Sequence, residues 1–310
     1  MNRRSFLAGS AAGLTLSPHV RPQEPQAAAP KATEAKAAGK PFQLDYAPHF
    51  GMFGNHAQSM VDQLQFAADQ GFRAWEDNGM AGRDEAVQKE LAAKMQQCGI
   101  RMGVFVAHAD FGAPTFASGK KDHQERVLAE IDRAIVVAER VQARWTTVVP
   151  GTVDHRLDPG FQLANVVDLL RRCCDRIAQK KSELVMVLEP LNFRDHPELF
   201  LTKVPQAFAI CRAVQSPHCK ILDDLYHQQI TEGNLIPNLE GAWDEIAYFQ
   251  VGDNPGRNEP GTGEVNFRNV FRRIHQKGFR GVVGMEHGNA HGGKDGELQL
   301  IAAYRDADSF

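Results

Sequence analysis

The chain has 310 residues, of which 43% are hydrophobic and 24% charged, and this is enough to bury one sizeable core. The formal net charge of −3 gives no sign of a nucleic acid partner or of a strongly charged binding surface. After the N-terminal region no run of about 18 apolar residues occurs, so stable membrane insertion is not expected.

The first 40 residues differ in composition from the rest. Met1 to Ser17 carries paired Arg3 and Arg4 before a short, mildly apolar run rich in Gly and Ala, and it resembles a twin-arginine export signal. A stretch rich in Ala, Pro, Gln and Lys then extends to about Lys40 and is typical of a linker. We expect residues 1–40 to be a signal with a flexible linker and residues 41–310 to be one folded domain. The protein would be exported to the periplasm, or stay in the cytoplasm if the leader does not function.

From Phe42 onward, short apolar segments alternate with amphipathic ones. Several apolar segments are continuous, such as Val185–Leu188, which is typical of strands covered on both faces. The predicted strands are Phe42–Pro48, Phe72–Glu76, Arg101–His108, Trp145–Val149, Leu184–Glu189, Lys220–Asp224, Ile246–Val251 and Gly281–Glu286.

The segments between the strands have helical periodicity. In residues 121–141 and 161–180, apolar side chains recur every three or four positions. Gly71, Gly99 and Gly278 stand where a helix would end in a left-handed residue. Eight strand–helix units with short connections predict an α/β fold, a (β/α)₈ TIM barrel. A doubly wound open sheet is the alternative, but no phosphate-binding glycine fingerprint follows the first strand.

The five cysteines are expected to be ordinary thiols. No C-x-x-C spacing occurs, which makes a zinc finger or a redox motif a poor explanation. Four of them, all but Cys219, fall in segments with helical periodicity, where a free thiol packs as a small hydrophobe.

Polar residues close four consecutive predicted strands. These residues are Glu189, Asp224, Gln250 and Glu286. In a barrel the C-terminal ends of the strands meet at one face, so three carboxylates and an amide would gather there. They would repel one another without a cation, and oxygen ligands favour Mg²⁺ or Mn²⁺. Asp223 competes with Asp224, because alternation lets only one of the two point into the barrel mouth.

Four motifs in this region resemble the xylose-isomerase-like barrel superfamily, and within it the hydroxypyruvate isomerases. They are Glu189-Pro190-Leu191-Asn192, Asp224-Leu225-Tyr226-His227, Gln250 with the segment 255–267 (PGRNEPGTGEVNF), and Gly284-Met285-Glu286. The resemblance extends from about Phe42 to the C-terminus. It implies a metal-dependent isomerase on a catalytic TIM barrel.

The resemblance also implies roles for individual residues. Glu189 and Glu286 match glutamates that bind the metal and move protons on opposite sides of the substrate, and Asp224, not Asp223, matches the metal-binding aspartate. Gln250 stands where related sugar epimerases have a histidine ligand and hydroxypyruvate isomerases have glutamine. His227 and Arg257 match residues that face the substrate.

Two further residues are weaker candidates for the substrate-binding site. Asp195 follows the Glu189 motif and is a candidate for substrate specificity, and His108 ends the third predicted strand. Glu76, at the end of the second strand, is expected either to line the pocket or to pair with an arginine.

The expected reaction interconverts a small α-hydroxycarbonyl compound through an enediolate, with hydroxypyruvate and tartronate semialdehyde as the pair. A ketose 3-epimerase or an enzyme of keto-sugars or keto-glycosides on the same metal site is the alternative, followed by a non-catalytic sugar-binding barrel. A small-molecule substrate is expected and nucleic acid is not. The sequence leaves homo-oligomerisation open.

Overall fold

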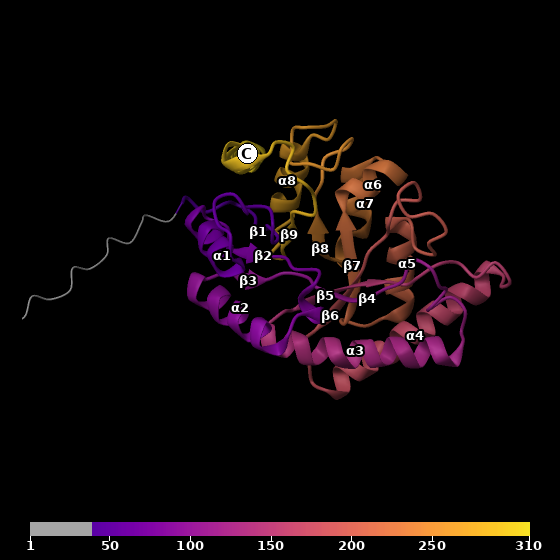
Figure 1. Cartoon of the computed structure of the whole chain (residues 1–310). Coiled ribbons are helices and arrows are strands. Elements are labelled where there is room, and N and C mark those ends of the chain that lie inside the picture. The colour runs from indigo at the N-terminus through magenta and orange to yellow at the C-terminus, as the bar shows by residue number, and fades with distance from the viewer. Residues whose placement is uncertain (1–38) are drawn as a thin grey trace, which may run out of the picture. The chain divides into compact units, whose positions relative to one another are not determined.

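The computed structural model describes residues 39–310, and within them parallel strands alternate with helices (Figure 1). The strands are β1 Tyr46–Ala47, β2 Ala74–Trp75, β3 Arg101–Met102, β4 Val106–Ala109, β5 Trp145–Val149, β6 Val185–Leu188, β7 Cys219–Asp224, β8 Ile246–Gln250 and β9 Val283–Gly284. Each falls within a segment predicted as a strand or overlaps it. The predicted leader lies almost wholly outside the described residues.

The strands form a closed barrel. Seven of them pair in the order β1-β9-β8-β7-β6-β5-β4, and β2 pairs with β3, all in parallel. Backbone hydrogen bonds join the two groups: Glu76 N–H, after β2, donates to the Pro48 carbonyl, after β1, at 2.9 Å, and Val106 N–H of β4 donates to the Asn78 carbonyl, after β2, at 3.3 Å. The predicted TIM barrel is therefore confirmed, and the open sheet is excluded.

The third predicted strand, Arg101–His108, is interrupted between β3 and β4. At Gly103 an added Cβ would lie 2.3 Å from the Tyr248 hydroxyl oxygen, which reaches across from β8. The same hydroxyl accepts the Val104 backbone N–H at 3.3 Å. The Tyr248 side chain thus binds a backbone N–H that a continuous strand would offer to a neighbouring strand. Within β4, the register with β5 shifts between Val106 and His108.

The helices cover the outside of the barrel. They are α1 Met60–Asp69, α2 Glu85–Cys98, α3 Lys121–Val141, α4 Pro159–Gln179, α5 Val204–Val214, α6 Leu225–Thr231, α7 Leu235–Ala242, α8 Phe267–Gln276 and α9 Gly293–Ala307, with short 3₁₀ turns η1 Met80–Gly82 and η2 Trp243–Glu245. The two helices predicted by periodicity correspond to α3 and α4. Among the described residues, no helix is both long and apolar enough to cross a bilayer.

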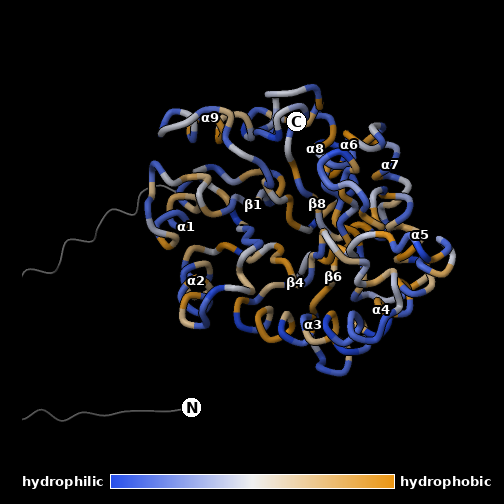
Figure 2. The backbone as a smooth tube through the Cα atoms, turned by 45° about the vertical axis from the view of Figure 1, so that its right-hand side comes forward, coloured by the Kyte–Doolittle hydropathy of each residue, from blue (hydrophilic) through white to orange (hydrophobic). Residues whose placement is uncertain are grey.

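The core lies between the strands and the helices. All residues of β5 and β6 are buried, as expected for strands covered on both faces. Figure 2 shows hydrophobic segments at the central strands, while the helices alternate between hydrophobic and hydrophilic residues. The five cysteines are free, with Cys98 half-buried and the other four buried, which confirms the expectation for the thiols.

Candidate active site

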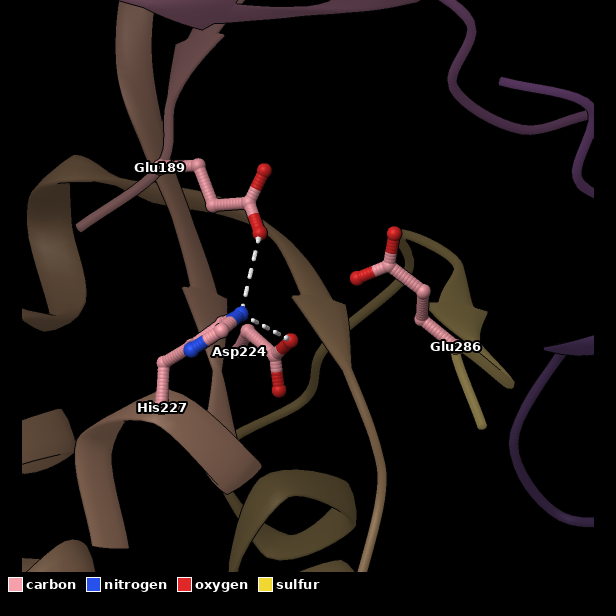
Figure 3. A group of neighbouring side chains, drawn as sticks. All are labelled: Glu189, Asp224, His227 and Glu286. Carbon is pink, nitrogen blue, oxygen red and sulfur yellow. Dashed lines mark ion pairs between the residues drawn. The ribbon is translucent and has the colours of Figure 1, made fainter. Parts of the chain in front are cut away.

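The strand ends bring a group of titratable side chains together. Glu189 follows β6, Asp224 ends β7, His227 lies in the first turn of α6, and Glu286 follows β9. One nitrogen or oxygen of each lies within 4.8 Å of those of the others. In Figure 3 the carboxylates of Glu189 and Glu286 approach from opposite sides, with Asp224 and His227 beneath them. The parallel strands thus deliver distant residues to one face of the barrel, as the sequence predicts.

Gln250 ends β8, directly between Asp224 and Gly284 in the strand register. Its Nε2 donates to Glu76 Oε1 at 2.5 Å, and the Tyr248 hydroxyl donates to Glu76 Oε2 at 3.0 Å. Glu76 therefore lies next to Gln250 and forms no ion pair with an arginine among the described residues. A Cβ on Gly284 would lie 1.9 Å from Glu76 Oε2, so this position must be glycine for Glu76 to reach Gln250.

Negative charge is concentrated in the site. Burial, together with the charge of Glu286, raises the pKa of Glu76 well above its usual range, and burial with the charges of Glu286 and Asp224 does the same for Glu189. Burial is also the main cause that raises the pKa of Glu286 to about 7. A cation in their midst would relieve both the burial cost and the repulsion.

Arg257 supplies one cation at the edge of the site. Its Nη2 donates to Asp224 Oδ2 at 2.9 Å and to Glu286 Oε2 at 2.7 Å, and its guanidinium lies 4.7 Å from the centre of the Tyr226 ring. Burial would lower the pKa of Arg257, but the nearby carboxylates outweigh this and raise it, so the side chain stays charged. Arg257 therefore lies beside Asp224 and Glu286, and its contact with substrate stays a prediction.

The donor set fits a divalent metal ion. Gln250 Oε1 is buried and has no hydrogen-bond partner among the described residues, although the other end of the same amide is held by Glu76. An orphaned buried carbonyl oxygen beside three carboxylates is the arrangement that a hard cation would satisfy. One guanidinium also leaves most of the carboxylate charge uncompensated. Glu189, Asp224, Gln250 and Glu286 are the residues that would hold the ion.

Hydrogen bonds from Asn192 fix the ring of His227. His227 is 1% exposed, and its Nδ1 lies 2.7 Å from Asn192 Nδ2 and 3.3 Å from the Asn192 backbone nitrogen. Its Nε2 lies 3.5 Å from Asp224 Oδ2 and 3.9 Å from Glu189 Oε1. Asp195 accepts from Asn192 Nδ2 and from the Tyr226 hydroxyl, both at 2.9 Å, so it supports this arrangement from the loop side.

His108 does not fit a substrate-binding role. Its Nδ1 lies 2.5 Å from Glu130 Oε2 and its Nε2 lies 2.9 Å from Thr115 Oγ1, and the residue is 3% exposed. Both ring nitrogens are therefore used within the protein, and the sequence interpretation of His108 as a substrate contact is corrected. The partners lie 22 and 7 residues away along the chain, where no local pattern marks them.

Asp223 takes no part in the group around Glu189. It is fully buried, and neither carboxylate oxygen has a hydrogen-bond partner among the described residues. Burial raises its pKa well above the usual range, which favours the neutral acid. Of the two aspartates, Asp224 is the one at the site, as the resemblance implied.

A cavity of about 290 Å³ opens beside Glu286. It is lined by His49, Phe50, Glu76, Asp77, Asn78, Gly79, Arg83 and Glu286. Asn78 Nδ2 donates to Glu286 Oε1 at 2.8 Å and so holds this carboxylate at the cavity edge. Nothing in the sequence marks Asn78 as a site residue, because a single asparagine in a loop carries no pattern of its own.

Comparison with known proteins assigns the fold to a family. The family model of the xylose isomerase-like TIM barrel matches residues 64–306, which is most of the chain. The chain belongs to this family.

Curated relatives of this family member are isomerases. The chain is 36% identical over 124 residues to hydroxypyruvate isomerase of Escherichia coli (strain K12), a match that covers 40% of this chain and 47% of that protein. It is 28% identical over 238 residues to 2-oxo-tetronate isomerase of Cupriavidus necator, which covers 76% of this chain and 89% of that protein. The solved structure of a 3-keto-D-glucoside 4-epimerase from E. coli has the same fold, with a TM-score of 0.70, 18% identity, and coverage of 85% of this chain and 99% of that one.

Proposed function

We propose that this member of the xylose isomerase-like family is a metal-dependent isomerase of a small α-hydroxycarbonyl compound. The preferred reaction converts hydroxypyruvate to tartronate semialdehyde. The observation that carries the proposal is the pair of carboxylates, Glu189 and Glu286, that face each other across the strand ends above Asp224 (Figure 3). The names of the curated relatives support the same class of reaction.

The two glutamates differ in their hydrogen bonds. Glu286 accepts from Asn78 on one oxygen and from Arg257 on the other. The Glu189 carboxylate accepts no hydrogen bond from any described residue. Its oxygens are therefore not occupied by protein donors, and we assign Glu189 as the base.

These positions suit a proton transfer between adjacent carbons. Glu189 takes a proton from the hydroxymethyl carbon of hydroxypyruvate, and the electron pair moves into an enediolate. A proton is then delivered to the former carbonyl carbon by Glu286 on the opposite side, or by Glu189 itself. The hydroxyl proton passes to the other oxygen, so substrate and product have the same atoms.

A divalent ion held by Glu189, Asp224, Gln250 and Glu286 would supply positive charge for the carbonyl and hydroxyl oxygens as negative charge develops on them. Arg257 would bind the substrate carboxylate. Its Nε and Nη2 are already engaged, but its Nη1 makes no hydrogen bond to the described residues, and the side chain is 29% exposed. Nη1 is therefore the part that a carboxylate can reach.

The test replaces each glutamate with its neutral isostere. Glu189→Gln and Glu286→Gln should each lower kcat at least about a hundredfold, because each removes a group that moves a proton. Hydroxypyruvate turnover and metal content are measured together, so that loss of the ion is separated from loss of the base. Full activity of both variants would refute this mechanism.

One observation favours a larger substrate as the second candidate. Phe111 is 54% exposed, and the centre of its ring lies 5.1 Å from that of His196. The ring centre of His196 in turn lies 5.6 Å from that of His227. This row of rings, together with the cavity beside Glu286, gives more room and more apolar surface than a three-carbon acid needs. A ketose 3-epimerase or an enzyme of keto-sugars and keto-glycosides would use both.

A substrate panel separates these candidates. Hydroxypyruvate, tagatose, psicose and a 3-keto-glucoside are compared by kcat/KM, and the true substrate should stand well above the others. Purified protein that binds metal but turns over none of them would instead support a sugar-binding barrel without catalysis.

A further inference from the structure

The buried nitrogen that His227 presents to the site decides what this residue can do. His227 Nε2 has no hydrogen-bond partner among the described residues and lies near the oxygens of Asp224 and Glu189. A neutral imidazole has one N–H and one lone pair. If the lone pair is on Nε2, His227 is a metal ligand; if the proton is there, His227 is a hydrogen-bond donor.

The orientation of the Asn192 amide is fixed independently of the histidine. Its Oδ1 accepts the backbone N–H groups of Arg194 at 3.0 Å and Asp195 at 2.9 Å. A backbone N–H can only donate, so the atom that faces these two groups must be the oxygen. The amide nitrogen then faces the other way, toward Asp195 Oδ2 at 2.9 Å and His227 Nδ1 at 2.7 Å.

Two N–H groups therefore point at His227 Nδ1. One is the side-chain amide of Asn192, and the other is its backbone N–H, 3.3 Å away. A proton on Nδ1 would oppose both, which disfavours the Nδ1–H tautomer as well as the imidazolium. Nδ1 must carry the lone pair and Nε2 the proton. The two carboxylate oxygens near Nε2 favour the same assignment, because they attract an N–H and repel a lone pair.

We propose that Asn192 is a positioning residue that fixes the Nε2–H tautomer of His227, the residue that the family resemblance places toward the substrate. Asn192 is buried, and its amide donates to Asp195 Oδ2, which also accepts from the Tyr226 hydroxyl. The role of the donor rests on the proposed function: it would stabilise the oxygen on which negative charge develops in the enediolate. The tautomer itself rests only on the hydrogen bonds.

The first test is nitrogen NMR of the full chain labelled with ¹⁵N-histidine, at mildly alkaline pH. The His227 resonances are identified by comparison with His227→Gln. We expect a neutral ring with the proton on Nε2, both without metal and after addition of Mg²⁺. A proton on Nδ1, a doubly protonated ring, or loss of the Nε2 proton when Mg²⁺ binds would each overturn the proposal.

The second test changes Asn192 and Asp195, singly and together. Asn192→Asp keeps the oxygen that accepts the Arg194 and Asp195 N–H groups but places an acceptor at Nδ1. The double variant Asn192→Asp/Asp195→Asn also keeps the local charge and the bond between positions 192 and 195. Both variants should move a proton onto Nδ1, whereas Asp195→Asn alone should keep the wild-type tautomer. An unchanged tautomer in the double variant would show that Asn192 does not fix it.

Kinetics then test the role of the donor. With the best substrate of the panel, the double variant should lose about a hundredfold in kcat while it retains metal content and melting temperature. Retained kcat despite a moved proton would overturn the role of His227 as donor. Absence of activity in the wild-type protein on every substrate would refute the proposed function, and the NMR result would still decide the tautomer.

Discussion

At the residue scale, Glu76 lies outside the predicted metal set but fixes the orientation of the Gln250 amide, which belongs to that set. Its carboxylate accepts the Gln250 amide N–H, so the other end of the amide, Gln250 Oε1, stays buried without a hydrogen-bond partner among the described residues. A glutamine at position 76 could pair with Gln250 in either orientation. We predict that Glu76→Gln weakens binding of Mg²⁺ or Mn²⁺ about tenfold, measured by calorimetric titration of the full chain.

The matched control for that variant is Glu130→Gln. Glu130 is likewise a glutamate that contacts a side chain from a barrel strand, but that side chain is His108 and not a residue of the predicted metal set. Metal affinity should stay unchanged in this variant. An equal loss of affinity in both variants, or no loss in Glu76→Gln, would contradict the orienting role of Glu76.

The same contacts mark the limit of sequence reasoning for single residues. Strand ends identify Glu189, Asp224, Gln250 and Glu286, because parallel strands of a barrel must deliver their C-terminal residues to one face. Nothing local connects Glu76 with Gln250, which lies 174 residues away, or Asn192 with His227. Such pairs form because the closed barrel brings these side chains together. No local sequence pattern predicts which side chains will be neighbours.

At the element scale, α9 is tied to the loop that follows β1 by one buried carboxylate. Glu297 Oε1 accepts the Asn55 backbone and side-chain N–H groups at 2.6 and 2.8 Å, and Oε2 accepts the His56 backbone N–H at 3.0 Å. Burial would raise the pKa of Glu297, but these bonds outweigh it and lower the pKa. We predict that Glu297→Gln lowers the free energy of unfolding by about 3 kcal/mol at neutral pH, measured by denaturant titration.

The pH dependence of that effect has a definite sign. A carboxylate whose pKa is lower in the folded state stabilises the fold fully above its unfolded pKa, and this contribution is lost as the pH falls through the folded pKa. The difference in stability between wild type and Glu297→Gln should therefore shrink in acid, below about pH 4.5. The exposed Glu90→Gln is the control and should change stability little. A difference that grows in acid would contradict the assignment.

Elements were more predictable than contacts. The alternation of apolar runs with helical stripes is enough to place α3, α4 and every strand segment, because both periods follow from which face is buried. The interruption between β3 and β4 was missed, since it depends on the Tyr248 hydroxyl crossing the barrel to the backbone beside Gly103. When a side chain from another strand interrupts a strand in this way, the only sign of it in the local sequence is a glycine.

At the scale of the whole molecule, the barrel is suited to export in the folded state, which we propose from the leader. Four of the five free cysteines are buried, so folding before export would protect their thiols from an oxidising compartment. Folding first would also let the carboxylate cluster take up its ion in the cytoplasm, before the chain crosses the membrane.

Replacement of the paired arginines tests this directly. We predict that Arg3→Lys combined with Arg4→Lys moves the protein from the periplasmic to the cytoplasmic fraction, because the twin-arginine pathway reads that pair. Arg21→Lys, a basic residue beyond the motif, is the control and should leave the distribution unchanged. The fractions are compared by immunoblot, with metal content and isomerase activity measured in each. Wild-type protein found only in the cytoplasm would contradict export. The chemistry proposed for the barrel would stand, because the residues to which it is assigned all lie among the described residues.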